Sequence, residues 1–226
     1  MGKTKRRKNS NYKANFETKN DAAAKDKKKN LIIAIVCAVI GVLFVGGMIV
    51  GIVVSSLPKI YYVEMDFGEY GSIVIEVDGE EAPITAKNFM KLVKKGFYDG
   101  LTIFRAQENF VIQGGRDDTA NLSSIVGEFE SNGYTNTISH LRGVISMARS
   151  SLPNSATSQF FITLHDDAKK SLDGRYAAFG RVVEGMDVVD AIAEAIMQCP
   201  SDSMGFVADN YAIEIVSAKQ LKNYKK

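Results

Sequence analysis

Two short runs of the sequence combine an arginine, a glutamine and two phenylalanines at strand-like spacing. They are FRAQENFVIQGG, from Phe104 to Gly115, and SMARSSLPNSATSQFFI, from Ser146 to Ile162. Arg105 carries a guanidinium that stays protonated and offers its donors in a rigid fork, whereas Gln113 can both donate and accept. Phe110 and Phe161 supply flat apolar walls. These residue types suit a site that grips a proline ring and the carbonyl group before it.

The reaction that such a site could accelerate is rotation about a prolyl amide bond. The barrier is about 18–20 kcal/mol because the C–N bond has partial double-bond character. An apolar pocket destabilises the charge-separated resonance form, and a donor aimed at the prolyl nitrogen stabilises the twisted amide. We therefore expect Arg105 to be that donor and Gln113 to hold either the substrate carbonyl or Arg105 itself. Catalysis by preferential binding of a twisted state needs no cofactor and no metal.

Other catalytic classes find little support in the sequence. His140 and His165 lack a cysteine or carboxylate at the spacing of a metal site, and the GxSxG pattern of a serine hydrolase is absent. We interpret His140 as a loop residue and His165 as a turn residue beside Asp166 and Asp167.

Both runs resemble, in residue identity and in spacing, the signature of the cyclophilins, a family of peptidyl-prolyl cis-trans isomerases. The resemblance covers roughly residues 60 to 218. It implies a mainly β fold, an eight-stranded antiparallel barrel capped by two α-helices. It also implies that the substrate-binding residues beside Arg105 and Gln113 are Phe110, Val111, Ala148, Arg149, Gln159, Phe161, Leu172 and Tyr176. Ala148 and Arg149 would offer backbone groups to the substrate strand.

Several positions depart from the family pattern. Val111 replaces the methionine that is common beside Phe110, and Tyr176 stands in place of a pocket histidine, where its ring can wall the proline site. Ser171 stands where some members have a tryptophan that helps bind cyclosporin, so weak cyclosporin binding is expected. Residues 116–124, RDDTANLSS, replace a glycine-rich loop, so the resemblance does not predict the adjoining substrate subsite.

The elements that must position these residues follow from hydrophobic periodicity. Alternation of apolar and polar residues predicts strands, and a period of 3.6 residues predicts helices. Strands are expected at 60–67, 72–77, 101–105, 110–113, 144–148, 159–164, 177–183 and 211–217. Helices are expected within 86–96, where Gly96 is a good terminator, and over 186–196. Residues 116–140 are polar and irregular, and only 125–129 are expected to pack.

Charge is distributed unevenly along the chain. Residues 1–30 hold 11 basic and 3 acidic residues, a net of +8, and residues 31–56 hold none. The remainder holds 17 basic and 23 acidic residues, a net of −6. Because phosphate contacts need a positive surface, this balance argues against nucleic acid as a partner of the folded part. No disulfide is expected between the two cysteines, Cys37 and Cys199.

The apolar segment from residue 31 to residue 54 has 24 consecutive residues without a charge or a strongly polar group. About 20 helical residues cross a bilayer core, and a helix satisfies every backbone group there. We therefore predict three parts, a basic cytoplasmic tail (1–30), a transmembrane anchor (31–56) and an isomerase domain (57–226). A cleaved signal peptide is the alternative, since Val54 and Ser56 suit a cleavage site, although such peptides have about 7 to 15 apolar residues.

The sequence as a whole predicts a membrane-anchored, bacterial-like isomerase that assists the folding of exported proteins. The excess of Lys and Arg before the apolar segment places the N-terminus in the cytoplasm and the domain outside the cell membrane. Its partners would be proline-containing polypeptides, whose prolyl steps take tens to hundreds of seconds unaided. Two alternatives remain, a proline-segment binding module or chaperone with incidental turnover, and a scaffold built through Gly47 and Gly51.

Overall fold

The computed structural model of the chain describes residues 39–40, 60–222 and 224. The chain divides into two units between Leu57 and Pro58, and the second unit contains residues 60–222 and 224. The tail predicted at residues 1–30 lies outside the described residues, and so does the predicted anchor apart from Val39 and Ile40. In the part of the chain that is described, no helix has the length and apolar character to cross a membrane.

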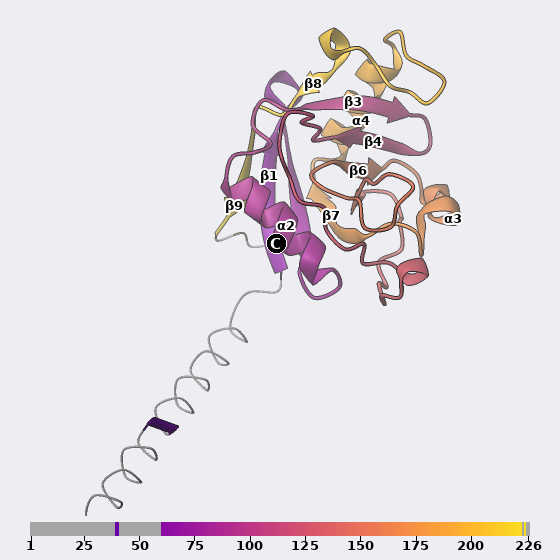
Figure 1. The fold of residues 1–226 in the computed structure, drawn as a ribbon. Helices are drawn as coiled ribbons and strands as arrows, with labels where there is room; N and C mark the ends of the chain where they lie inside the picture. The colour runs from indigo at the N-terminus through magenta and orange to yellow at the C-terminus, as the bar shows by residue number, and fades with distance from the viewer. Residues whose placement is uncertain (1–38, 41–59, 223, 225–226) are drawn as a thin grey trace, which may run out of the picture. The chain divides into compact units, whose positions relative to one another are not determined.

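The second unit is mainly β, and nine strands form one curled sheet (Figure 1). The strands are β1 (Ile60–Asp66), β2 (Ser72–Asp78), β3 (Thr102–Gln107), β4 (Val111–Gly114), β5 (Val144–Met147), β6 (Phe160–Thr163), β7 (Ala178–Glu184), β8 (Ile213–Glu214) and β9 (Ser217–Leu221). Their order in the sheet is β8-β3-β4-β6-β5-β7-β2-β1-β9. Every neighbouring pair is antiparallel.

The expectation of an eight-stranded barrel is corrected to a curled sheet of nine strands, because a ninth strand, β9, follows the last predicted one. The segment expected at 211–217 gives β8, which pairs with β3, and leads into β9, which pairs with β1. Between them, Ile215 donates its N–H to the carbonyl of Leu101 at 2.7 Å, and Val216 donates to the carbonyl of Asp66 at 2.8 Å. Two consecutive residues therefore join the two edges of the sheet.

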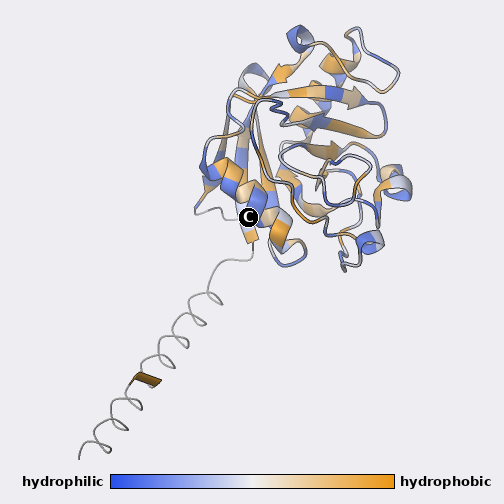
Figure 2. Cartoon of the chain, viewed as in Figure 1, coloured by the Kyte–Doolittle hydropathy of each residue, from blue (hydrophilic) through white to orange (hydrophobic). Residues whose placement is uncertain are grey.

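The described unit has three α-helices, α2 (Pro83–Lys94), α3 (Lys169–Leu172) and α4 (Met186–Met197). Both long helices were predicted from their periodicity, whereas α3 was not. One-turn 3-10 helices lie at Gly68–Tyr70, Glu130–Asn132, Asp166–Ala168 and Asp209–Tyr211. Figure 2 shows hydrophilic and hydrophobic residues alternating along α2, and its predicted inward residues Phe89, Leu92 and Val93 are buried.

A cluster of aromatic rings joins α2 to the sheet. Phe89 is fully buried, and its ring centroid lies 5.3 Å from that of Tyr98, 5.0 Å from that of Phe179 and 6.2 Å from that of Phe160. Phe160 belongs to β6, in which successive side chains point to opposite faces of the sheet. The packing of Phe160 in this core therefore directs its neighbour Phe161 to the other face.

A distant carboxylate caps the beginning of α2. Ala82 precedes the helix and has no side-chain oxygen to offer. Glu128, which is 2 % exposed, instead accepts hydrogen bonds from the N–H of Ile84 (3.0 Å), the N–H of Thr85 (2.7 Å) and the Thr85 hydroxyl (2.7 Å). The first N–H groups of a helix lack intrahelical partners, and the helix dipole favours a negative charge there. Glu128 thus ties the loop 116–140 to the helix.

Candidate active site

Four neighbouring strands place a row of polar and aromatic residues on one face of the sheet. Arg105 of β3 is the register partner of Gln113 in β4, and Gln113 is the partner of Phe161 in β6. Phe161 is in turn the partner of Ser146 in β5. Directly opposite residues have Cβ atoms about 4.5–5.5 Å apart, so the register alone brings these side chains together. A bulge in β3 just before Arg105 is the kind of irregularity that redirects a side chain.

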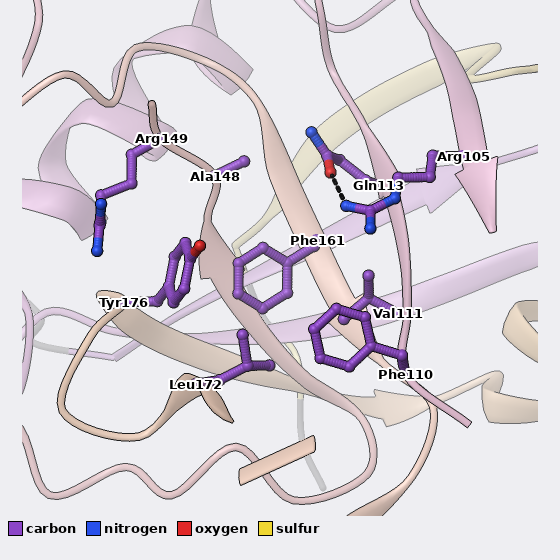
Figure 3. Close-up of a pocket in the computed structure, with 9 residues that line it drawn as sticks. All are labelled: Arg105, Phe110, Val111, Gln113, Ala148, Arg149, Phe161, Leu172 and Tyr176. Atoms are coloured by element: carbon purple, nitrogen blue, oxygen red, sulfur yellow. Dashed lines mark hydrogen bonds between the residues drawn. The ribbon is translucent and has the colours of Figure 1, made fainter. Parts of the chain in front are cut away.

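This row borders a cavity of about 100 Å³. The cavity is lined by Arg105, Phe110, Val111, Gln113, Ala148, Arg149, Phe161, Leu172 and Tyr176 (Figure 3). Nine of the ten predicted site residues therefore line one cavity. The tenth, Gln159, does not line the cavity. Its side-chain carbonyl accepts a hydrogen bond from Nε2 of Gln113 at 3.0 Å, so it acts on the site by orienting Gln113.

The apolar part of the cavity is built around Phe161. In Figure 3 its ring lies between those of Phe110 and Tyr176, with Leu172 beside it. The Tyr176 ring meets it edge-on, with the ring centroids 5.4 Å apart. The unpredicted helix α3 supplies Leu172, and Ala168, just before that helix, is buried in the same cluster. These surfaces form a flat-walled apolar recess, which suits a small ring.

The polar part of the cavity is the guanidinium of Arg105. Its Nη1 donates to Oε1 of Gln113 at 2.9 Å, its Nη2 to Oε1 of Gln107 at 2.9 Å, and its Nε to the carbonyl of Met204 at 2.8 Å. A guanidinium has five N–H donors, so two of them have no acceptor among the described residues. Burial lowers the pKa of Arg105, and the nearby charge of Asp202 opposes that shift. The site therefore offers a fixed cation with two donors to a substrate.

The loop that holds Arg105 was missed by the sequence reading. Asp202 accepts hydrogen bonds from the N–H groups of Met204 (2.8 Å) and Phe206 (3.0 Å), and Gly205 donates to the Asp202 carbonyl at 3.0 Å. The Phe206 ring packs 5.0 Å from the Arg105 guanidinium carbon. Asp202 and Gly205, three residues apart, are typical of a tight turn. The sequence can predict such a turn, but it does not predict that the turn packs against Arg105 of β3.

A second arginine borders the cavity on the side opposite Arg105 (Figure 3). The guanidinium of Arg149 donates to the carbonyl of Arg175 from Nε (3.1 Å) and Nη2 (2.8 Å), and it lies 4.7 Å from the centre of the Tyr176 ring. The N–H of Ala148, expected to meet the substrate, donates instead to the Gln159 carbonyl at 2.9 Å. The Ala148 carbonyl and the Arg149 N–H have no partner among the described residues.

Beneath Phe161 lies a buried histidine. His140 is a loop residue, as predicted, but it is only 1 % exposed. Its Nδ1 lies 2.8 Å from Oδ1 of Asp173, its Nε2 lies 3.1 Å from the Ser146 hydroxyl, and its ring stacks on that of Phe161 with the centroids 5.9 Å apart. Ser146 is fully buried, so no substrate reaches this Ser-His-Asp chain. It supports the floor of the recess.

Stability is expected to fall as the pH drops below the usual histidine pKa, because of His140. Burial lowers the pKa of His140, and its contact with Asp173 only partly opposes this. The unfolded chain therefore binds a proton near pH 6.5 that the folded domain does not bind. The contribution of neutral His140 to the free energy of unfolding is complete above that pH and is lost as the pH falls. Urea unfolding of the wild type and of His140→Gln at pH 7.5 and 5.5 measures it. Equal pH dependence in the two proteins would refute this assignment.

Metal and thiol chemistry find no further support in the described residues. There, no group of three or more His, Cys, Asp or Glu is arranged to hold a metal ion. His165 lies at a turn, as predicted, and its Nδ1 accepts a hydrogen bond from the N–H of Asp167 at 3.1 Å. Cys199 is a free thiol, while Cys37 lies outside the described residues.

Comparison with known proteins agrees with this geometry. Residues 62–219 match the family model described as "Cyclophilin type peptidyl-prolyl cis-trans isomerase/CLD". A peptidyl-prolyl cis-trans isomerase of Acinetobacter baylyi is 44 % identical over 126 residues, which cover 54 % of this chain and 67 % of the relative. Peptidyl-prolyl cis-trans isomerase B of Escherichia coli is 39 % identical over 129 residues, covering 54 % of this chain and 79 % of the relative.

Solved structures show the same fold. A cyclophilin type peptidyl-prolyl cis-trans isomerase of Cryptosporidium parvum, crystallised in the presence of the dipeptide Ala-Pro, superposes with a TM-score of 0.59 at 27 % identity. The match covers 72 % of this chain and 99 % of that one. Another crystal structure of the Cryptosporidium parvum isomerase gives a TM-score of 0.59 at 25 % identity, and the match covers 73 % of this chain and 99 % of that one.

Proposed function

The chain belongs to the cyclophilin family of peptidyl-prolyl cis-trans isomerases, and from this premise we propose that it catalyses prolyl isomerisation in the cavity between Arg105 and Tyr176. The proline ring lies in the apolar recess against Phe161. The two remaining donors of Arg105 face the prolyl amide. The observation that supports this most is the cross-strand row from Arg105 through Gln113 to Phe161, which sets a fixed cation directly beside an apolar recess.

The mechanism that we propose follows from differential binding of the twisted amide. In the planar amide the nitrogen lone pair is shared with the carbonyl, whereas in the twisted state it is free to accept a hydrogen bond. A donor aimed at that nitrogen therefore stabilises the transition state more than the ground state. Gln113 holds the guanidinium through Nη1 and is itself oriented by Gln159, so the donors are in place before the amide twists.

The substrates that we propose are polypeptides with an exposed X-Pro bond. A related isomerase was crystallised in the presence of Ala-Pro, and the apolar recess around Phe161 offers flat walls to a small ring. The Ala148 carbonyl and the Arg149 N–H are the backbone groups that an extended substrate would meet.

We propose further that this isomerase is bacterial-like and anchored in the cell membrane through residues 31–54, with its domain on the outer side. The length of the apolar segment and the excess of cations before it support this placement. The clients would then be exported proteins, and slow prolyl steps would limit their folding. N-terminal sequencing of the mature protein decides whether the anchor is retained, because a start near Leu57 would mean cleavage.

A proline-limited refolding assay tests the enzymatic proposal. The full chain in mild detergent is expected to accelerate the slow phase of refolding of a protein whose rate is limited by a prolyl bond, in proportion to the enzyme concentration. Arg142→Ala is the control, because it removes an arginine that is exposed and pairs with Asp190 outside the cavity. An unchanged slow phase in the presence of the wild type would exclude catalysis and favour the binding-module alternative.

Cyclosporin is expected to inhibit this enzyme weakly. Ser171 stands where cyclosporin-sensitive relatives have tryptophan, and its hydroxyl is turned to the Ala168 carbonyl at 3.2 Å. A serine offers neither the apolar area nor the indole donor of that tryptophan. Ser171→Trp is expected to tighten inhibition by about tenfold or more, as one hydrogen bond and the buried ring would give. Inhibition titrations on both proteins measure the difference, and equal inhibition would contradict it.

A further inference from the structure

Four lysines lie along the exposed side of α2. They are Lys87, Lys91 and Lys94 of the helix and Lys95, its C-cap residue, here called the lysine face. Their spacing of four, seven and eight residues puts them on one side of a helix. All four are exposed, and none takes part in a salt bridge or a side-chain hydrogen bond with any described residue. The opposite side of α2 is buried, with Phe89 fully enclosed, so the helix is held with its lysines outward.

Helix stability does not account for the lysine face. Like charges three or four residues apart on a helix repel one another. The helix dipole favours cations only in the last turn, where Lys91 and Lys94 lie, and Lys87 gains nothing from it. Residues 57–226 hold 17 basic and 23 acidic residues, so four of these 17 are gathered on one helix and its C-cap in an acidic domain. Such a concentration of charge fits an anionic partner.

The place of the lysine face points to the partner. Its four lysines, with Tyr61 and Met90, line a shallow hollow of about 370 Å³. Tyr61 is the second residue of β1, so the hollow lies between α2 and the beginning of β1; both elements are labelled in Figure 1. Only five residues, 55–59, separate the apolar segment ending at Val54 from Ile60. At about 3.3–3.6 Å per extended residue, a connection of five residues can span roughly 18 Å at most.

We propose that the lysine face docks on the anionic lipid headgroups of the membrane that holds residues 31–54, an inference that rests on the anchor proposed above. Lysines close to a membrane surface are attracted by anionic lipids within about a Debye length. Tyr61 is suited to the interface because it has an apolar ring and a polar tip. No residue lines both this hollow and the active-site cavity. Docking therefore fixes the orientation of the tethered domain and leaves the cavity free for client chains.

Lysine acetylation in lipid nanodiscs tests this docking. The full chain is reconstituted in discs of phosphatidylcholine alone and in discs with added phosphatidylglycerol, and acetylation by a water-soluble reagent is followed by mass spectrometry. Lys87, Lys91, Lys94 and Lys95 are expected to react about threefold more slowly, or slower still, in the anionic discs. Lys169 and Lys170, exposed on α3, are internal controls whose rates stay equal. At 1 M salt, where the Debye length is about 3 Å, the protection is expected to vanish.

The outcomes separate the two proposals. If the chain enters both kinds of disc but the lysine face reacts equally in each, the docking is refuted and the anchor stands. If the chain does not co-elute with either kind of disc, the anchor is refuted, and the docking falls with it. If Lys169 and Lys170 are protected as strongly as the lysine face, the attraction is not specific to α2 and the proposal is also wrong.

Discussion

Replacement of Arg105 by alanine is expected to lower kcat/KM for prolyl isomerisation by about 10²–10³, the range found when one preorganised donor is removed from a catalytic site. The guanidinium is held by Gln113, Gln107 and the Met204 carbonyl, so its two remaining donors are aimed before the substrate arrives. Because the proposed mechanism has these donors act on the twisted amide, the loss should fall on kcat, with KM little changed. NMR exchange measurements on an Ala-Pro peptide at saturating concentrations separate the two constants.

Arg105→Lys is the informative companion variant. Lysine keeps the charge but presents a compact ammonium in place of the planar fork, so it cannot bond Gln113 and Met204 and face the amide in the same geometry. We expect it to recover little of the lost activity, whereas Arg142→Ala should match the wild type. Full activity in Arg105→Lys would show that charge alone is sufficient, and full activity in Arg105→Ala would remove the proposed mechanism altogether.

Glu128→Ala should be the most damaging single change of a polar side chain for stability, at about 3 kcal/mol or more of unfolding free energy. The buried carboxylate receives three hydrogen bonds at the start of α2. Its removal leaves the N–H of Thr85 and the Thr85 hydroxyl buried without their acceptor, and each such group costs about 1–3 kcal/mol. Urea unfolding followed by circular dichroism measures the loss.

Glu81→Ala is the matched control for that variant. Glu81 also accepts one backbone and one hydroxyl hydrogen bond from a single threonine, Thr137, both at 2.9 Å, but it does so at the surface. There water can replace the lost acceptor, so a decrease of about 1 kcal/mol or less is expected. Equal losses in the two variants would mean that burial of Glu128 contributes nothing to its role.

Local pattern was enough to predict most of the strands and both long helices. Alternation placed β1 and β2 within one residue at each boundary, and the helical spacing of Phe89, Leu92 and Val93 identified the inward side of α2. The passage of the chain from β8 into the ninth strand, β9, was not visible in the same pattern. It depends on backbone hydrogen bonds from Ile215 to Leu101 and from Val216 to Asp66, which no side-chain periodicity records.

Site residues were predicted where their side-chain type and spacing are distinctive, and they were missed where only the backbone takes part. Arg105, Gln113 and Phe161 stand out by type and spacing, and the register of three strands brings them together. Met204 accepts a hydrogen bond from Arg105 through its backbone carbonyl. Any residue type could do this at position 204, so the methionine side chain does not indicate the role. His140 was correctly placed in a loop, but its burial follows from contacts with Asp173, 33 residues further along the chain.

The joining of the two sheet edges also governs the order in which the domain can form. β1 pairs with β9, so Tyr62 must find Leu221, which lies 159 positions later (221 minus 62). Pairings between such distant residues raise the contact order and slow folding. During N-to-C synthesis, one side of β1 stays open until β9 arrives, and an unpaired strand edge is a template for aggregation. A foldase built in this way is itself a late folder, and its nascent domain depends on shielding until the closing segment has emerged.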